Sequence, residues 1–191
     1  GARGAATEVV HYPGAGGEGF VAYSHNAVER IDAVIAGFAD AECDFEWKVY
    51  SHDEPLDLKD QLGARGFEIG EAEELMVLAV AEAGALLDAA SDVRIERGAA
   101  AVDDFIALHG GRTELHASDG DVPYVAYEGD APAACARATF PEGFAFAGLW
   151  SGFTRPESRG RGLYRAVLAA RARDAAERGE AYITVDALPT R

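Results

Sequence analysis

Cysteine, lysine and long uncharged apolar runs are all scarce in this 191-residue sequence. The two cysteines, Cys43 and Cys135, lie far apart and without CxxC spacing. This argues against a disulfide framework or a cysteine zinc site and fits a reducing cytoplasm. No stretch approaches the roughly 20 apolar residues that a membrane-spanning helix requires, and no apolar signal-peptide region follows Gly1–Ala5. We therefore expect a cytoplasmic protein without a membrane partner.

Positive charge is scarce as well. The formal net charge is −16, which argues against a nucleic-acid partner, because affinity for a phosphate backbone comes from lysine and arginine. Residues 151–191 are the exception, with eight arginines and five acidic residues. A site for a phosphate-bearing ligand is therefore expected in this segment, and the alternative is a solvated helix face rich in arginine.

The residues that are present indicate an α/β protein with two units. Hydrophobic residues make up 49% of the chain and charged residues 26%, which provides enough apolar material for a buried core. The first unit is expected over residues 1–80. Its segments are strands over 9–12, 20–23, 45–50 and 74–78, and helices over 28–38 and 57–62, the first capped by Asn26 and the second opened by Pro55.

Residues 81–92 are alanine-rich, and we interpret them as a linker with a short helix. The second unit is expected over residues 93–191. Its segments are a strand over 93–95, a helix over 99–109, a hairpin of 124–127 and 135–140, a strand over 144–153, a helix over 163–178 and a last strand over 182–186. Gly110 and Gly179 stand where the two helices should end.

A glycine-rich loop lies between the strand at 144–153 and the long helix that follows. Gly160 and Gly162 have no Cβ, so the backbone can turn tightly and bring its N–H groups close to a ligand. The helix that follows directs its unsatisfied N–H groups and the positive end of its dipole at the same place. Arg159, Arg161 and Arg165 add positive charge. The pattern indicates a pyrophosphate cradle, and the alternative is a simple turn.

This loop resembles the acyl-CoA loop of the GNAT N-acetyltransferase superfamily. The family pattern V-x-P-x-x-R-G-x-G is matched by Thr154, Pro156, Arg159, Gly160 and Gly162, with threonine in place of valine. The order of hairpin, central strand, loop, long helix and strand also agrees. The resemblance implies an α/β (α+β) fold of the GNAT type, with a mixed, mostly antiparallel sheet flanked by helices. It also implies acetyl-CoA as co-substrate and no metal.

The resemblance assigns separate residues to each part of CoA. The backbone of Phe153 and Thr154 would pair with the pantetheine amides. The pyrophosphate would be held by N–H groups of Arg159, Gly160, Arg161, Gly162, Leu163 and Tyr164. A base must also take a proton from the attacking amine. Asp186, at the end of the last strand, is the candidate base, and the alternative is a cap or a surface charge.

The sequence departs from the family pattern in three places. Glu157 stands where the family often has glutamine or arginine, and Tyr164 stands where a small residue is common. In the family, a helix and two more strands follow the last strand, and we expect the second unit to lack them after Arg191. Gly66-Phe67 and the strand predicted around Leu75–Leu78 are candidates to cover the resulting sheet edge, and we therefore expect residues 1–78 to pack directly on residues 93–191. A second chain, in a homodimer, is the alternative.

The first unit has a fainter resemblance to the closing half of the same family, which reads helix, strand, helix, Gly-Phe and strand. No glycine pair and no arginine precede its first helix. We therefore expect a degenerate GNAT-like half without a CoA site, and the alternative is any α+β module with similar spacing. The histidines show no metal-ligand spacing, and His52, Asp53 and Glu54 are interpreted as the start of a helix before Pro55.

The sequence thus predicts an N-acetyltransferase that moves an acetyl group from acetyl-CoA to an amine, either a small molecule or a peptide. A non-catalytic acyl-CoA-binding or regulatory protein of the same fold is the first alternative. An interaction scaffold, in which the glycine loop is only a turn, is the second.

Overall fold

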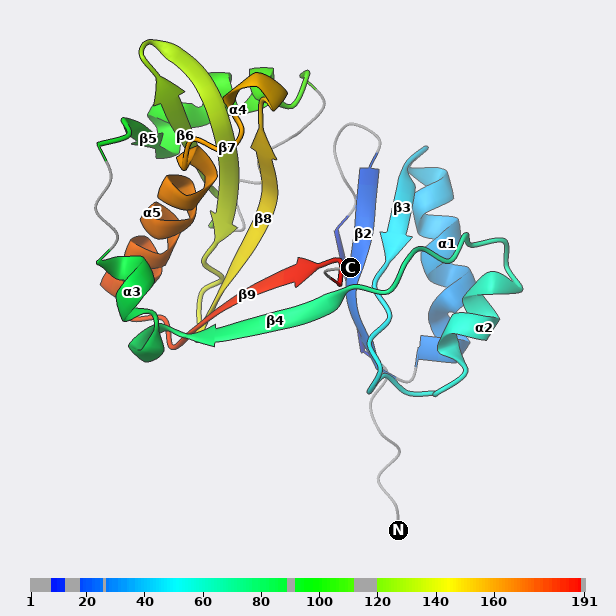
Figure 1. Ribbon diagram of the computed structural model, residues 1–191. Helices are drawn as coiled ribbons and strands as arrows, with labels where there is room; N and C mark the ends of the chain where they lie inside the picture. Colours follow the sequence, from blue (N-terminus) through cyan, green and yellow to red (C-terminus); the bar gives the residue numbers. More distant parts are fainter. Residues whose placement is uncertain (1–7, 13–17, 26, 89–91, 112–119, 190–191) are drawn as a thin grey trace. The chain divides into compact units, whose positions relative to one another are not determined.

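The computed structural model describes residues 8–12, 18–25, 27–88, 92–111 and 120–189 (Figure 1). The chain divides into two compact units, Gly1–Glu71 and Ala72–Arg191. The predicted cap at Asn26 lies outside the described residues.

The first unit is a three-stranded sheet with two helices. Its elements are β1 (Glu8–Tyr12), β2 (Glu18–His25), η1 (Ala27–Arg30), α1 (Ile31–Asp40), β3 (Asp44–Trp47) and α2 (Leu58–Gly63). β1 and β2 pair antiparallel, whereas β2 and β3 pair parallel, with α1 as the connection between them. This is the strand–helix–strand arrangement expected from the sequence, and its derivation from a GNAT-like half stays a prediction.

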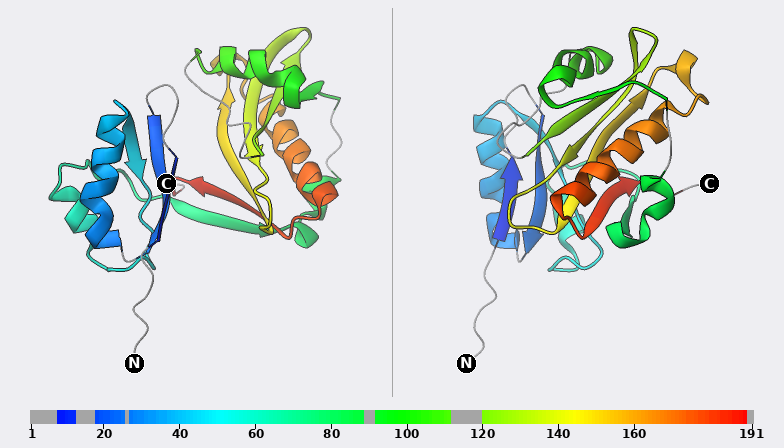
Figure 2. Two further views of the ribbon diagram at one scale, coloured as in Figure 1. Left: turned by 180° about the vertical axis from the view of Figure 1, so that it is seen from behind. Right: turned by 90° about the vertical axis from the view of Figure 1, so that its left-hand side faces the viewer.

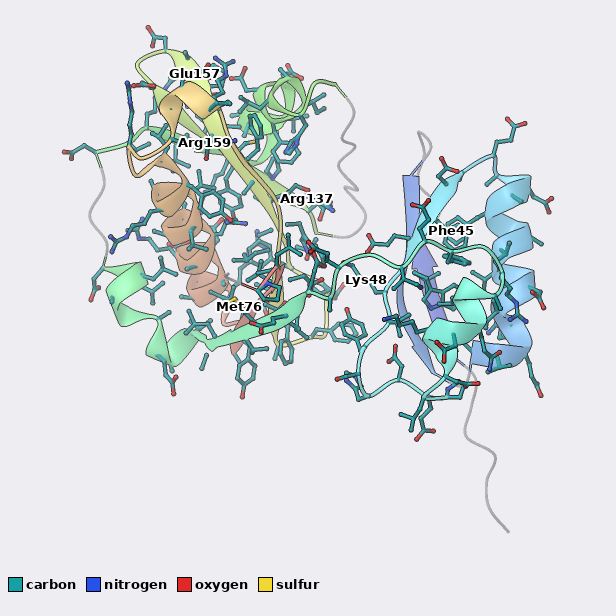
Figure 3. All side chains as sticks on the ribbon, turned by 45° about the vertical axis from the view of Figure 1, so that its right-hand side comes forward. Phe45, Lys48, Met76, Arg137, Glu157 and Arg159 are labelled. Carbon is teal, nitrogen blue, oxygen red and sulfur yellow. The ribbon has the colours of Figure 1, made fainter. Side chains whose placement is uncertain are left out.

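The core of the first unit lies between α1 and the sheet. Ile31, Val34 and Phe38 are buried at the three- and four-residue spacing that places them on one face of α1. Phe38 stacks on Phe45 of β3, with ring centroids 4.0 Å apart; Phe45 is labelled in Figure 3. Trp47 is buried beside them. The apolar spacing in the sequence therefore identified the buried face of the helix correctly.

The second unit contains a six-stranded sheet. Its elements are β4 (Glu74–Ala79), η2 (Val80–Glu82), α3 (Gly84–Leu87), β5 (Ile95–Arg97), η3 (Gly98–Ala101), α4 (Val102–Leu108), β6 (Val122–Glu128), β7 (Ala131–Thr139), β8 (Phe146–Thr154), η5 (Pro156–Ser158), α5 (Leu163–Arg178) and β9 (Tyr182–Ala187). The strand order is β4-β9-β8-β7-β6-β5. All neighbours pair antiparallel except β8 and β9, which pair parallel. The predicted mixed, mostly antiparallel sheet is confirmed.

Two helices cover opposite faces of this sheet (Figure 2). Leu163 and Val167 of α5 pack on Tyr124 and a set of buried alanines in β6 and β7. Phe105 of α4 packs on Cys135, on the other face. The alanines let the helix backbone approach the strands closely, since each side chain ends at Cβ. Among the described residues, no helix is long and apolar enough to cross a membrane.

The boundary between the units differs from the one expected after residue 80. It lies between Glu71 and Ala72, because β4 pairs with β9 along its whole length, from Glu74 opposite Ala187 to Ala79 opposite Tyr182. The expected linker over 81–92 also belongs to the second unit and contains the short helix α3. The sequence interpretation placed β4 with its chain neighbours, whereas long-range hydrogen bonding places it beside the last strand. Of the two candidates to cover that edge, Leu75–Leu78 lies in β4 and pairs with β9, which confirms it. Gly66-Phe67 is not a strand, and Phe67 packs on the core of the first unit instead.

Candidate functional site

The two parallel strands β8 and β9 separate along their length (Figure 1). They pair only where Phe146, Ala147 and Gly148 face Tyr182, Ile183 and Thr184. β8 stays paired with β7 on its other side as far as Thr154, which faces Ala134. In the described part of the sheet, the β9-side edge of β8 beyond Gly148 therefore has no strand partner. Backbone groups on such an edge can bind an extended amide-containing ligand.

β8 contains a β-bulge within this unpaired stretch. Trp150 faces Arg137 and Phe153 faces Cys135, so two residues of β8, Ser151 and Gly152, are opposed by a single residue of β7. Ser151 has a φ of 52°, in the left-handed region that non-glycine residues seldom adopt. The bulge shifts the alternation of side chains by one residue. Consequently, Leu149 and Gly152 both face α5, whereas Phe153 faces α4.

His109, at the end of α4, contacts the bulge directly. Its Nε2 lies 3.2 Å from the carbonyl oxygen of Ser151 and 3.5 Å from the Sγ of Cys135. The ring is half-buried, and this burial is the main cause that lowers the pKa of His109 below its ordinary 6.5. Arg137 donates from Nε to the Oγ of Ser151 at 3.2 Å. Both the carbonyl and the side chain of Ser151 are therefore held from the α4 face of the sheet.

The glycine loop has the geometry that the sequence predicts. Gly160 has a φ of 76° and Gly162 a φ of 80°, and a Cβ built on either would have no neighbouring atom within 4 Å. Gly162 is the residue before the first turn of α5, and no side chain caps that turn. The N–H groups in the first turn of α5 therefore have no side-chain cap among the described residues, as in an anion-binding helix N-terminus.

The arginines of the loop contact protein groups. Arg161 forms an ion pair with Glu128, at the end of β6. Arg159 donates from Nε to the carbonyl of Thr154 at 3.3 Å, and Figure 3 labels its side chain beside that of Glu157 in this loop. Ser158 is buried and donates to the other carboxylate oxygen of Glu128 at 3.0 Å. Glu128 thus connects the loop to the sheet and offsets the charge of Arg161.

A cavity of about 480 Å³ lies beside the start of α5. Its lining residues are Asp92, Val93, Arg94, Tyr127, Glu128, Gly129, Arg161 and Leu163. Two of them, Arg161 and Leu163, belong to the predicted CoA loop. The hollow is open to solvent, and its charged lining consists of two carboxylates, Asp92 and Glu128, and two guanidinium groups, Arg94 and Arg161.

Two further predicted residues lie elsewhere in the site. The side chain of Tyr164 folds over β8 at Gly152, whereas only its backbone was expected to take part. Asp186 is half-buried on β9, where it faces Leu75 of β4. It lies two residues beyond the last β9 residue that pairs with β8. Within the described ranges, no group of three or more His, Cys, Asp and Glu side chains has the arrangement of a metal site.

Ser151, His109 and Glu128 were not among the predicted site residues. A bulge depends on how two strands register, and one strand's sequence does not contain that register. His109 lies 42 residues before Ser151 in the chain, so only the packing of α4 on the sheet brings them together. For Glu128 the sequence contained one indication of its place. It precedes the Gly129-Asp130 turn of the predicted hairpin, so it had to lie at one end of the sheet.

Comparisons with known proteins give the class of fold. No protein-family model matches the sequence, and no curated protein sequence matches it. Among solved structures, a GCN5-related N-acetyltransferase from Kribbella flavida superposes with a TM-score of 0.65 and 16% identity, over 88% of this chain and 70% of that one. A functionally unknown conserved protein from Staphylococcus epidermidis superposes with a TM-score of 0.58 and 15% identity, over 91% of this chain and 75% of that one.

The chain therefore has the fold of the GNAT superfamily, as the loop motif implied. The similarity to the Kribbella flavida structure extends over most of both chains. At 16% identity it defines the architecture, and the chemistry has to be argued from the residues of this chain.

Proposed function

We propose that this protein is an N-acetyltransferase that takes its acetyl group from acetyl-CoA. The observation that carries the proposal is that the glycine loop directly follows the edge of β8 that has no strand partner in the described part of the sheet. The glycine loop with its open N–H groups begins eight residues after the bulge at Gly152, and the edge of β8 between them has no strand partner among the described residues. A ligand with a diphosphate at one end and an amide-containing arm fits both features at once.

The proposed path of the ligand follows from the direction of β8. The diphosphate binds the N–H groups of residues 159–164, and the pantetheine amides pair with the backbone of Phe153 and Thr154. From Thr154 back to Ser151 the strand extends about 10 Å, at about 3.3 Å per residue. The thioester end of the ligand therefore reaches the bulge.

Acyl transfer at this place needs little from the protein. A neutral amine attacks the thioester carbonyl, its proton passes to a base, and the CoA thiolate leaves. A strand N–H at the bulge stabilises the oxyanion that develops on the carbonyl. Asp186 is the candidate base because it lies on β9 next to the strand's last residue, beyond the part of β9 that pairs with β8. The acceptor is an amine of a small molecule or a peptide.

Isothermal titration with acetyl-CoA tests the proposal first. Saturable binding with one site per chain is expected, and it should weaken when CoA is replaced by pantetheine, which lacks the diphosphate. A second assay follows acetyl-CoA consumption against a panel of primary amines. Binding without turnover for any amine would favour the non-catalytic acyl-CoA-binding alternative, and no binding would exclude both.

A further inference from the structure

We propose that His109 is a positioning residue for acyl transfer, whose Nε2–H holds the Ser151 carbonyl so that the Gly152 N–H faces the bound thioester. The inference rests on the proposed function, because it requires a thioester bound at the bulge. His109 itself does not touch the thioester.

The proton of the His109 ring lies on Nε2. Burial lowers the pKa of His109, so the ring is neutral at pH 7 and carries one proton. A carbonyl oxygen can only accept a hydrogen bond, and the Ser151 oxygen lies 3.2 Å from Nε2. The Cys135 thiol, 3.5 Å away, is fully buried, and burial raises its pKa to about 12, so it stays uncharged. Nε2 therefore donates to Ser151, and Nδ1 carries the lone pair.

The Ser151–Gly152 peptide sets the direction of the Gly152 N–H. The C=O and N–H of a trans peptide point in opposite directions. The Ser151 carbonyl is directed at His109, on the α4 face of the sheet. The N–H of Gly152 therefore points away from α4, toward the α5 face of the sheet, at the bulge where the thioester end of the proposed CoA path lies. A Cβ on Gly152 would also project to this face, 2.8 Å from the Oη of Tyr164. The Tyr164 ring lies on the same face at Gly152, so the thioester oxygen of a ligand on that path reaches this donor beside the ring.

Neighbouring side chains hold both the His109 ring and Ser151 in place. Phe105, one turn earlier on α4, lies 4.8 Å from the His109 ring centroid, and Phe153 of β8 lies 5.9 Å from it. Arg137 of β7, labelled in Figure 3, pairs with Asp121 and donates to the Ser151 Oγ. Two aromatic rings thus fix the imidazole, and two donors fix Ser151 in its left-handed conformation. Such a conformation persists only when its surroundings determine it.

The decisive experiment compares binding of acetyl-CoA with binding of CoA. Only acetyl-CoA carries the carbonyl that the Gly152 N–H would contact. His109→Leu keeps an apolar side chain in the same place but has no donor, and we expect about a tenfold loss of affinity for acetyl-CoA with CoA affinity within about twofold of wild type. His109→Gln has its amide nitrogen the same number of bonds from Cα as Nε2, and it should restore the preference for acetyl-CoA. Cys135→Ala removes the other neighbour of Nε2 and should leave the preference unchanged.

The outcomes separate this inference from the proposed function. Wild-type protein that binds neither acetyl-CoA nor CoA overturns the proposed function, and the inference with it. Wild-type protein that binds both, with a folded His109→Leu variant that keeps the wild-type ratio of affinities, overturns the inference alone. If His109→Leu does not fold, ¹H–¹⁵N correlation of the imidazole in wild-type protein decides. The Nε2–H tautomer and a Gly152 amide shift specific to acetyl-CoA support the inference, and the Nδ1–H tautomer overturns it.

Discussion

The ring of Tyr164 lies directly against the backbone of Gly152. A Cβ on Gly152 would be 2.7 Å from the nearest ring carbon of Tyr164 and 2.8 Å from its Oη, closer than real Cβ contacts come. The first turn of α5 and the bulge of β8 therefore pack against each other, and a side chain at position 152 would have to displace the Tyr164 ring. Tyr164 is 43% exposed, so the ring has solvent on its other side.

Gly152→Ala should displace the Tyr164 ring toward solvent. The expected cost is about 1–3 kcal/mol in the free energy of unfolding, since an added methyl in a filled position forces its neighbours to move. The double variant Gly152→Ala with Tyr164→Ser should recover most of this loss. Urea unfolding of the four proteins in this cycle measures the coupling. Equal effects of Gly152→Ala with and without Tyr164 would show that the contact has no energetic consequence.

Gly162→Val should weaken acetyl-CoA binding at least about tenfold by titration, because it places a branched side chain in front of the helix N-terminus and strains a φ of 80°. Gly179→Val is the matched control. Gly179 ends the same helix with a φ of 81° and equally open surroundings. Both variants should lower Tm by similar amounts, whereas only Gly162→Val should affect the ligand. A folded Gly162→Val variant with wild-type affinity would mean that the loop is only a turn.

Arg159→Ala should reduce affinity for CoA more than affinity for pantetheine, and the difference should shrink as salt rises, because exposed charges are screened over about 8–10 Å. Glu128→Gln tests the ion pair with Arg161 from the other side. Removal of this carboxylate frees the guanidinium, so CoA affinity should increase by about two- to fivefold. Arg178→Ala, at the far end of α5, is the control. Equal losses for CoA and pantetheine in Arg159→Ala would indicate a general structural defect.

The pKa of His109 predicts one component of the pH dependence of stability. Burial lowers this pKa in the folded protein, so the unfolded chain takes up the proton first as the pH falls through about 6.5. The free energy of unfolding should therefore decrease as the pH falls from 7.5 to 5.5. His109→Gln should make this decrease smaller. Urea unfolding at several pH values measures both slopes, and identical slopes would contradict the assignment.

Residues 72–191 should fold as a unit, whereas residues 93–191 should not. The shorter fragment lacks β4 and would expose the β9 edge and its hydrogen-bonding groups. We expect the longer fragment to melt cooperatively and the shorter one to aggregate or melt without cooperativity. Calorimetry and analytical ultracentrifugation of the two fragments make the comparison. A monomeric 93–191 fragment with a cooperative melt would show that β9 does not need β4.

Local patterns in the sequence determined most of the helices and strands. The apolar spacing of α5 gave its bounds, Leu163–Arg178, and Gly179 ended it where a left-handed residue was required. The motif from Thr154 to Gly162 gave the loop and the positions of its two positive-φ glycines. These features depend on neighbours within a few residues, and such neighbours are visible in a sequence.

Tertiary structure alone decided the features that join distant segments. The pairing of β4 with β9, the bulge at Ser151 and Gly152, and the contact of His109 with that bulge all join residues far apart in the chain. The ion pair of Arg161 with Glu128 is another such feature. The positive charge of Arg161 suggested a phosphate ligand, whereas the fold places the Glu128 carboxylate beside it. Strand register and the packing of a helix on a sheet depend on the whole fold, and the sequence pattern of one segment does not contain them.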